Sequence, residues 1–185
     1  MKVYYAPNSR AVRIVWLLEE LGLDYEVERF ALGDKAMRAP NYLQIHPMGR
    51  VPALEDDGVM LFESGAIVEY VLARHGNGRM VPSVDSAEYP TYLQWLHYAE
   101  GMIMPPVNTI VVETLFLSAE RRNQTNIDRA TKLLGRMLTA VDRETPDESG
   151  SLSSVRICDN WPCFSSRVPT IAVSSGPSVS VGRLA

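Results

Sequence analysis

The chain has 185 residues, of which 46% are hydrophobic and 22% are charged, and it carries a formal net charge of -4 at pH 7. This length and hydrophobic content are enough to build one or two packed domains. Because charges of both signs are interspersed, with no Lys/Arg block that would neutralise a run of phosphates, the composition argues against a nucleic-acid partner.

The chain opens with Met1–Tyr5, which passes directly into a strand-like pattern without the features of a signal peptide. Its uncharged apolar runs are shorter than the ~18 residues needed to span a bilayer. The two cysteines, Cys158 and Cys163, fit neither a CxxC redox pair nor a zinc-ligand set. We therefore expect a cytoplasmic protein with no membrane span, no metal site and no disulfide framework.

The first thirty residues alternate between strand and helix patterns. Lys2–Ala6 predicts a strand, and apolar residues at helical spacing then predict a helix from Ala11 to Leu21 that ends at Gly22. Tyr25–Phe30 alternates with period two and predicts a second strand. This order is typical of a βαβ unit.

A β-hairpin and a helix follow. Val51–Leu54 and Val59–Phe62 predict two strands, and the Asp57-Gly58 pair between them suits the positive φ angles of a tight turn. Ser64 is expected to cap a helix that runs to Gly76. The first part of the chain is therefore expected to form a compact α/β domain.

The second half of the chain is expected to be helical as far as Glu144. Strand patterns stop at Tyr89, and two apolar stripes at helical spacing extend from Tyr92 to Phe116 and from Ile127 to Val141, with a kink expected at Pro105-Pro106. Residues 146–185 contain ten serines, whereas residues 1–145 contain five. Because this tail has no sustained period and several prolines, we expect little regular structure in it.

Four segments together resemble the cytosolic glutathione transferase family, of the bacterial, serine-using type. They are Tyr5–Arg13 (YAPNSRAVR), Leu18–Leu23 (LEELGL), Pro47–Leu54 (PMGRVPAL) and Glu63–Ile67 (ESGAI). Each is weak alone, but their spacing makes the combination fairly specific, and the resemblance covers residues 1 to about 143.

The resemblance implies a fold class and a domain organisation. The N-terminal domain at 1–76 is expected to be α/β, thioredoxin-like and glutathione-binding. A linker at 77–86 then leads to a partial all-α domain at 87–144, and an irregular Ser-rich tail follows at 145–185. Because the match ends within a helix after Arg143, we expect the helical domain to be incomplete. We hypothesise a change of reading frame or an aberrant end of the coding sequence near residues 144–147.

The turn before the first helix holds the candidate catalytic residues. Where thioredoxin-like redox proteins carry a CxxC pair, this chain has Pro7-Asn8-Ser9-Arg10, which excludes dithiol exchange there. A hydroxyl at a helix N-terminus can instead donate to a bound thiolate, and the first-turn amides add positive partial charge. Ser9 is therefore the catalytic candidate, with Asn8 as an alternative amide donor and Tyr5 as a weaker third. The alternative is that Ser9 only caps the helix.

The resemblance implies the other contacts to glutathione. Val51-Pro52 resembles the family's cis-proline dipeptide, whose first residue offers its main chain to the cysteinyl unit, although an ordinary trans proline at a sheet edge is the alternative. Glu63 and Ser64 resemble the pair that holds the γ-glutamyl group, with a simple helix cap as the alternative. Arg50 is a candidate for the glycyl carboxylate, or else a solvated surface residue.

The implied function is that of a glutathione S-transferase in detoxification. Such an enzyme joins the glutathione thiolate to an alkyl or aryl carbon of a small hydrophobic electrophile. The implied co-substrate is glutathione without a metal, and the implied assembly is a homodimer. Incompleteness of the helical domain would impair the activity. Peroxide reduction, dehalogenation and isomerisation on the same site stay open, as does a non-catalytic glutathione-binding or protein-interaction module. Four helix residues are candidates for the electrophile pocket or simply core: Trp95, Tyr98, Met102 and Met104.

Overall fold

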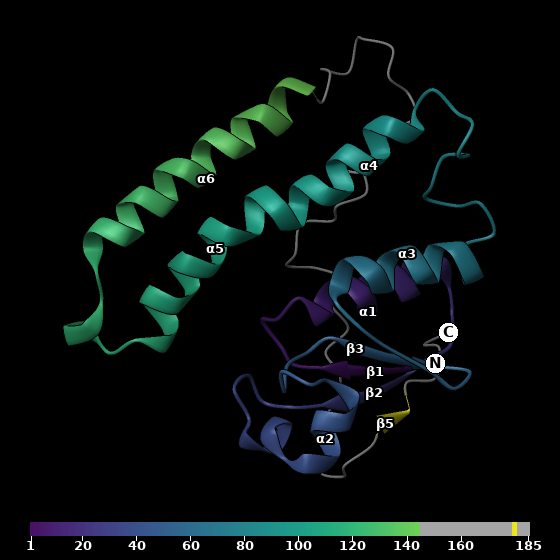
Figure 1. The fold of residues 1–185 in the computed structure, drawn as a ribbon, viewed down its shortest axis with the longest axis horizontal. Coiled ribbons are helices and arrows are strands. Elements are labelled where there is room, and N and C mark those ends of the chain that lie inside the picture. The colour runs from purple at the N-terminus through teal and green to yellow at the C-terminus, as the bar shows by residue number, and fades with distance from the viewer. Residues whose placement is uncertain (145–178, 181–185) are drawn as a thin grey trace. The chain divides into compact units, whose positions relative to one another are not determined.

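The computed structural model describes residues 1–144 and 179–180 (Figure 1). These residues divide into two compact units. The first contains residues 1–86 together with 179–180, and the second contains residues 87–144. Residues 77–86, predicted as a linker, are part of the first unit, where the Arg79 guanidinium donates to the main-chain carbonyl of Leu21 over 2.5 Å.

The first unit is built on a mixed sheet with the strand order β4-β3-β1-β2-β5. The strands are β1 (Lys2–Tyr5), β2 (Glu26–Arg29), β3 (Ala53–Asp56), β4 (Val59–Phe62) and β5 (Val179–Ser180). β1 and β2 are parallel, and the other neighbouring pairs are antiparallel. The thioredoxin-like fold predicted from the sequence is therefore confirmed. The two-residue β5 was not predicted.

Helices cover both faces of this sheet (Figure 1). α1 (Ala11–Leu21) and α3 (Ser64–His75) lie on one face, and α2 (Pro40–Ile45) lies on the other, after the 3-10 turn η1 (Lys35–Arg38). The boundaries of α1 agree with the sequence prediction, and so does the end of α3 before Gly76, whereas α3 begins at Ser64, the residue that was expected to cap it. η1 and α2 were missed because each is too short to show a helical period.

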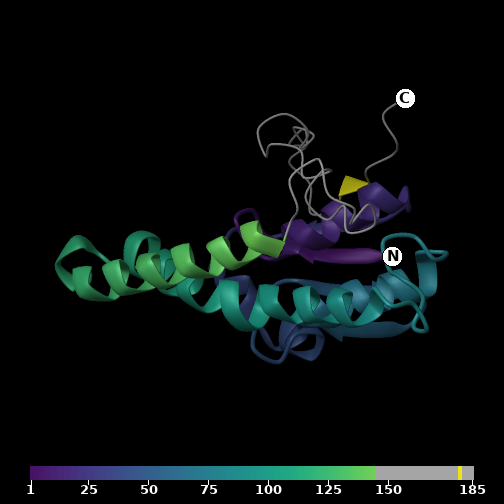
Figure 2. The ribbon, with the colours of Figure 1, turned by 90° about the horizontal axis from the view of Figure 1, so that it is seen from above.

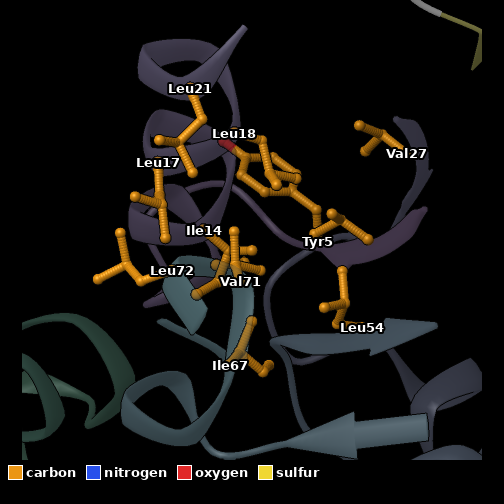
Figure 3. Packing of buried hydrophobic residues seen from close by; sticks show 12 residues of the cluster. Tyr5, Ile14, Leu17, Leu18, Leu21, Val27, Leu54, Ile67, Val71 and Leu72 are labelled. Atoms are coloured by element: carbon orange, nitrogen blue, oxygen red, sulfur yellow. The ribbon is translucent and has the colours of Figure 1, made fainter. Parts of the chain in front are cut away.

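The main hydrophobic core lies between the sheet and the helices α1 and α3 (Figure 3). Its fully buried members from the two helices include Ile14, Leu18, Ile67 and Val71, which meet Leu54 from β3. Burying each such side chain stabilises the fold by roughly 1.5–3 kcal/mol. A smaller cluster on the opposite face is formed by Tyr4, Met37, Tyr42 and Ala53. This division follows from the alternation of side chains along the strands, as with the neighbours Val3 and Tyr4.

Two turns in this unit confirm the local sequence signals. Gly22 adopts φ 65° at the end of α1, and its N–H donates to the last carbonyls of the helix. Asp57 and Gly58 have φ angles of 47° and 78°, as a tight hairpin turn between β3 and β4 requires. β3 begins at Ala53 rather than at the predicted Val51, because Val51-Pro52 precedes the ladder that pairs with β1.

The second unit is a pair of long helical segments that lie side by side (Figures 1 and 2). The first segment comprises α4 (Tyr89–Tyr98), the π turn η2 (Ala99–Ile103), α5 (Met104–Val111) and the π turn η3 (Val112–Phe116). A short 3-10 turn, η4 (Ala119–Arg121), leads to the second segment, α6 (Gln124–Glu144). The π turn η2 ends two residues before Pro105, next to the position where a kink is predicted. A proline lacks the N–H that the regular hydrogen-bond ladder of an α-helix requires. A π turn accommodates this missing donor.

A buried carboxylate organises the start of α6. Oε2 of Glu113 accepts from the N–H of Asn123 at 2.8 Å, and its Oε1 accepts from the side chain of Asn126 at 3.0 Å. The hydrogen bond from Asn126, followed by that from Asn123, lowers the pKa of Glu113. The side chain of Asn123 in turn accepts from the Asn126 N–H at 3.2 Å, as an N-cap residue does.

Among the described residues the second unit buries few side chains. Met137 and Ala130 are buried on α6, whereas Leu133 and Leu138 of the same helix are more than 40% exposed. The apolar stripe of α6 is therefore only partly covered, with Met137 buried and two leucines exposed. The predicted tail 145–185 and the hypothesised change near residues 144–147 lie outside the described residues, apart from Glu144 and β5. No helix in the described part of the chain is long and apolar enough to cross a membrane.

Candidate functional site

Strand register brings three distant segments to one end of the sheet. Tyr4 pairs with Ala53, and Ala53 pairs with Phe62, so these residues form one row across β1, β3 and β4. The turn that follows β1, the residues that precede β3 and the residues that follow β4 all lie beyond this row. The predicted residues Asn8, Ser9, Arg50, Val51, Pro52, Glu63 and Ser64 all belong to these segments.

Ser9 is held by two local hydrogen bonds. Its hydroxyl donates to the main-chain carbonyl of Ala6 at 2.6 Å and accepts from the N–H of Ala11 at 3.2 Å. The second bond satisfies a first-turn donor of α1, although Arg10, and not Ser9, is the N-cap residue of that helix. Asn8 beside it is exposed and has φ 58°, a left-handed conformation that asparagine tolerates better than most residues. No hydrogen bond of the Asn8 carboxamide to another described residue is present.

The segment before β3 is shaped by a tight turn. The N–H of Gly49 donates to the carbonyl of His46 at 2.7 Å, with Pro47 at the second position of the turn. The Tyr42 hydroxyl then donates to the main-chain carbonyl of exposed Arg50 at 2.8 Å. The peptide bond between Val51 and Pro52 is cis, as the resemblance implied.

Val51 lies between the two hydrophobic clusters of the first unit and packs on both. Among the backbone hydrogen bonds that lie outside the regular helices and strands, none joins the N–H or C=O of Val51 to another described residue. Pro52 is buried behind it. The main chain of Val51 is therefore held firmly by packing while its polar groups stay available.

Glu63 has an unusual backbone conformation at the start of α3. It is the N-cap residue, with φ 75° and ψ 112°, and its side chain makes no capping hydrogen bond. Non-glycine residues rarely adopt such angles, and when they do the surrounding structure must hold them there. Ser64 occupies the first position of α3 and is only 4% exposed. The sequence prediction that Ser64 is the N-cap was wrong, because the chain enters the helix through Glu63.

His46 is the residue that the sequence pattern undervalued. It is 5% exposed, and the centroid of its ring lies 4.8 Å from that of Phe62. Its Nδ1 atom accepts from the N–H of Met48 at 3.2 Å. Burial is the largest influence on the pKa of His46 and lowers it, and Arg50 lowers it further, against an opposing effect of Glu63. The position of His46 after a short helix gave no sequence signal for this burial.

The remaining candidates lie elsewhere. Tyr5, the weakest of the catalytic candidates, is buried in the main core (Figure 3). In the second unit the rings of Trp95 and Tyr98 pack edge to face with centroids 5.1 Å apart, and the Tyr98 hydroxyl donates to the carbonyl of Met137 at 3.2 Å. Within the described residues, no group of three or more His, Cys, Asp or Glu side chains is arranged to hold a metal ion.

The fold and these segments define a thioredoxin-like domain with a candidate ligand site at one end of its sheet. Residues 1–73 match the family model of the glutathione S-transferase N-terminal domain. Glutathione S-transferase 3 of Schizosaccharomyces pombe is 37% identical over 103 residues, which cover 56% of this chain and 42% of that protein. Glutathione S-transferase 4 of Zea mays is 35% identical over 152 residues, which cover 77% of this chain and 65% of that protein.

A solved structure agrees with these relatives. The glutathione transferase homolog of Lodderomyces elongisporus, crystallised with two GSH per subunit, is 25% identical, with a TM-score of 0.69 over 77% of this chain and 68% of that one. The first unit of the chain therefore matches the glutathione S-transferase N-terminal domain, and the chain is similar to glutathione S-transferases over a larger part of its length. It spans about 42% and 65% of the length of the two curated relatives.

Proposed function

We propose that this chain binds glutathione and transfers it, as a thiolate, to an electrophilic carbon of a small apolar substrate. The observation that carries the proposal is the strained backbone of Glu63 at the first turn of α3, in a domain of the glutathione S-transferase family. Strained backbone of this kind clusters at ligand sites. The relatives named above are glutathione S-transferases, and the homolog of Lodderomyces elongisporus was crystallised with GSH.

The γ-glutamyl end of glutathione is assigned to the start of α3. In this arrangement the carboxylate of Glu63 accepts hydrogen bonds from the ligand's ammonium group. Ser64 and the first-turn amides of α3 receive its α-carboxylate, because a helix N-terminus offers N–H donors and a positive partial charge. The side chain of Glu63 is free of a capping bond, which supports a ligand role over a cap.

The cysteinyl and glycyl units are assigned to the segment before β3. The main-chain N–H and C=O of Val51 pair with the cysteinyl unit as an added strand would. Arg50 is exposed beside it, and the side chain of Arg38 passes close to Gly49. These two guanidinium groups supply positive charge for the glycyl carboxylate.

Activation of the sulfur is the catalytic step of the proposal. The thiolate is the nucleophile, and lowering a thiol pKa by two units from about 8.5 takes about 2.7 kcal/mol. One charge-assisted hydrogen bond and the N-terminus of α1 together are of that order. The Ser9 hydroxyl already donates a hydrogen bond to the main-chain carbonyl of Ala6. We therefore assign the hydrogen-bond donor to the thiolate to the carboxamide of Asn8, with Ser9 ordering the turn.

A second candidate function is glutathione binding without turnover, or a protein-interaction role on the same fold. The observation that favours it is the engagement of the Ser9 hydroxyl at both its donor and its acceptor side. If Asn8 does not contact the sulfur, the Ser9 hydroxyl is not free to stabilise the thiolate in its place. The ligand would then be held but not activated.

One experiment separates the two candidates. Retention of the protein on immobilised glutathione shows whether the site binds, and a thiolate absorbance titration of bound glutathione then gives the pKa of its sulfur. Depression of that pKa below the value for free glutathione supports the transferase. Binding with an unshifted thiol supports the binding module. Absence of binding removes both glutathione functions and leaves only the protein-interaction role.

The finer features of the activity are part of the same proposal. We infer that the electrophiles are small and apolar, that the role is detoxification in the cytoplasm, and that the working form is a homodimer without a metal. Conjugation assays with a panel of aryl and alkyl halides and of peroxides separate transfer from the related reactions. Sedimentation at several protein concentrations tests the dimer.

A further inference from the structure

His46 contacts two of the segments assigned to glutathione. Its main-chain N–H ends α2 by donating to Tyr42 at 2.9 Å, and its carbonyl accepts from Gly49 at 2.7 Å. Its imidazole Nδ1 accepts from the N–H of Met48 at 3.2 Å. The residue therefore fixes the turn that leads directly into Arg50 and Val51.

The side-chain bond closes this turn in a specific way. A side-chain acceptor that bonds the N–H two residues later reproduces the Asx turn formed by asparagine and aspartate. Because Nδ1 of His46 accepts, the neutral ring carries its proton on Nε2. A doubly protonated imidazole has no acceptor, so it cannot form the bond to Met48.

The ring of His46 also contacts the second segment. It lies against the ring of Phe62 with centroids 4.8 Å apart and planes tilted by 37°. Phe62 directly precedes Glu63, whose strained backbone opens α3. The orientation of the Glu63 carboxylate thus depends on a packing contact made by the same side chain that closes the other segment.

We propose that neutral His46 is a positioning residue that holds the Arg50–Pro52 and Glu63–Ser64 segments in register, and that protonation of its ring releases glutathione. This inference rests on the proposed function, because it concerns the affinity of the glutathione site. His46 itself touches no ligand in this account.

The charged surroundings of the ring fit this role. Glu63 at the start of α3 and Arg50 after the turn are the charged groups that act on the imidazole from the segments packed against it, and their effects on it oppose each other. Burial lowers the pKa of His46 below the ordinary value of 6.5, so the ring is neutral at pH 7. The ammonium and carboxylates of glutathione keep their charges between pH 5.5 and 7.

The chain contains three histidines, His46, His75 and His97, so each imidazole can be tested in turn. The full chain is titrated calorimetrically with glutathione between pH 5.5 and 7.5. His46→Asn keeps an acceptor for the Met48 N–H and removes the titrating ring. His46→Phe keeps a ring against Phe62 and removes the acceptor. His97→Asn and His75→Asn are the matched controls, and His97 is exposed on α4.

We expect the affinity of the wild-type protein for glutathione to fall as the pH is lowered. The steepest dependence should be about tenfold per pH unit, which is the slope for one linked proton. His97→Asn and His75→Asn should keep this profile, whereas His46→Asn should bind with a flat profile. His46→Phe should bind about two- to tenfold more weakly at pH 7, the equivalent of one hydrogen bond.

The outcomes separate this inference from the proposed function. A wild-type protein that does not bind glutathione overturns both. Binding that is independent of pH in wild type, or a pH profile that survives in His46→Asn, overturns the role of His46 alone. If the two His46 variants fail to fold, loss of the pH profile in His75→Asn or His97→Asn overturns it equally.

Discussion

The Nε2 atom of His75 lies 2.7 Å from Oδ2 of Asp56, and this pair ties the last turn of α3 to the end of β3. The Tyr70 hydroxyl donates to the same oxygen at 3.1 Å. Burial is the largest influence on the pKa of Asp56 and raises it. The hydrogen bonds from His75 and Tyr70, with the charges of His75 and of the chain's N-terminus, outweigh burial and lower the pKa overall.

The sign of this shift predicts how stability depends on pH. A carboxylate with a lowered folded-state pKa stabilises the fold above its unfolded pKa of about 3.9, and this stability is lost as the pH falls through the folded value. We expect Asp56→Asn to lower the free energy of unfolding by about 1–2 kcal/mol at pH 6. The deficit should shrink below about pH 4.

Urea denaturation at pH 6 and at pH 3 measures this difference. Glu69→Gln, at an exposed carboxylate on the same helix, is the control and should change stability little at either pH. Equal stability of Asp56→Asn and wild type at pH 6 would show that the pair contributes nothing net.

A second prediction concerns the turn that begins at His46. Gly49 has φ 56°, and a Cβ at this position would collide with the main-chain carbonyl oxygen of Met37. Gly33 has φ 80° with open space around it. We expect Gly33→Ala to cost about 1–2 kcal/mol from the left-handed backbone alone. Gly49→Ala should cost about 2–5 kcal/mol, because the main chain must also move.

Thermal unfolding of both alanine variants checks this prediction. A Cβ would meet a carbonyl oxygen at Gly49 but open space at Gly33. The extra loss of stability in Gly49→Ala therefore measures the effect of that close approach. A similar cost for both variants would mean that the Met37 segment moves aside freely.

The sequence predicted those parts of the fold that depend on neighbouring residues. α1 from Ala11 to Leu21 and its end at Gly22 follow from apolar spacing and a left-handed cap. The Asp57-Gly58 turn follows from its two positive φ angles. α2 and β5 were missed, because six and two residues carry too little pattern to separate them from loop.

The site was predictable in its residue types but not in its conformations. The sequence identified Ser9 and Glu63, but it could not show that the Ser9 hydroxyl is bound to Ala6 or that Glu63 has φ 75°. The burial of His46 depends on Phe62, sixteen residues along the chain and on another element. Such features arise from tertiary contacts, which override local preference.

The assignment of the thiolate donor to Asn8 gives a third prediction. Asn8→Gly removes the carboxamide and suits the φ of 58°, so the fold should be retained. We expect the pKa of bound glutathione's thiol to rise in Asn8→Gly by about one to two units, because a charge-assisted hydrogen bond is lost. Ser9→Ala should instead lower stability by about 1 kcal/mol through the lost hydrogen bond to the first turn of α1, with a smaller change in the thiol pKa.

The absorbance titration of bound glutathione, combined with urea unfolding, reads both quantities in each variant. The reverse pattern, with the larger pKa change in Ser9→Ala, would assign the contact to the hydroxyl after it turns away from Ala6.

The strained backbone of Glu63 gives the last prediction, in which stability and binding change in opposite directions. Glu63→Gly relieves a conformation that costs about 1–3 kcal/mol, partly offset by about 0.5–1 kcal/mol of glycine chain entropy. The variant should therefore unfold at a higher urea concentration than wild type. It should also bind glutathione about tenfold more weakly or worse, because a hydrogen bond between charged groups contributes about 1.5–3 kcal/mol.

Glu63→Ala is the matched control, because alanine removes the carboxylate but keeps the strain at φ 75°. It should lose binding to the same extent as Glu63→Gly without gaining stability. The difference in unfolding free energy between the two variants then measures the strain, and the loss they share measures the carboxylate. If Glu63→Gly were less stable than Glu63→Ala, the backbone at this position would not be strained, and its conformation would no longer support a ligand site.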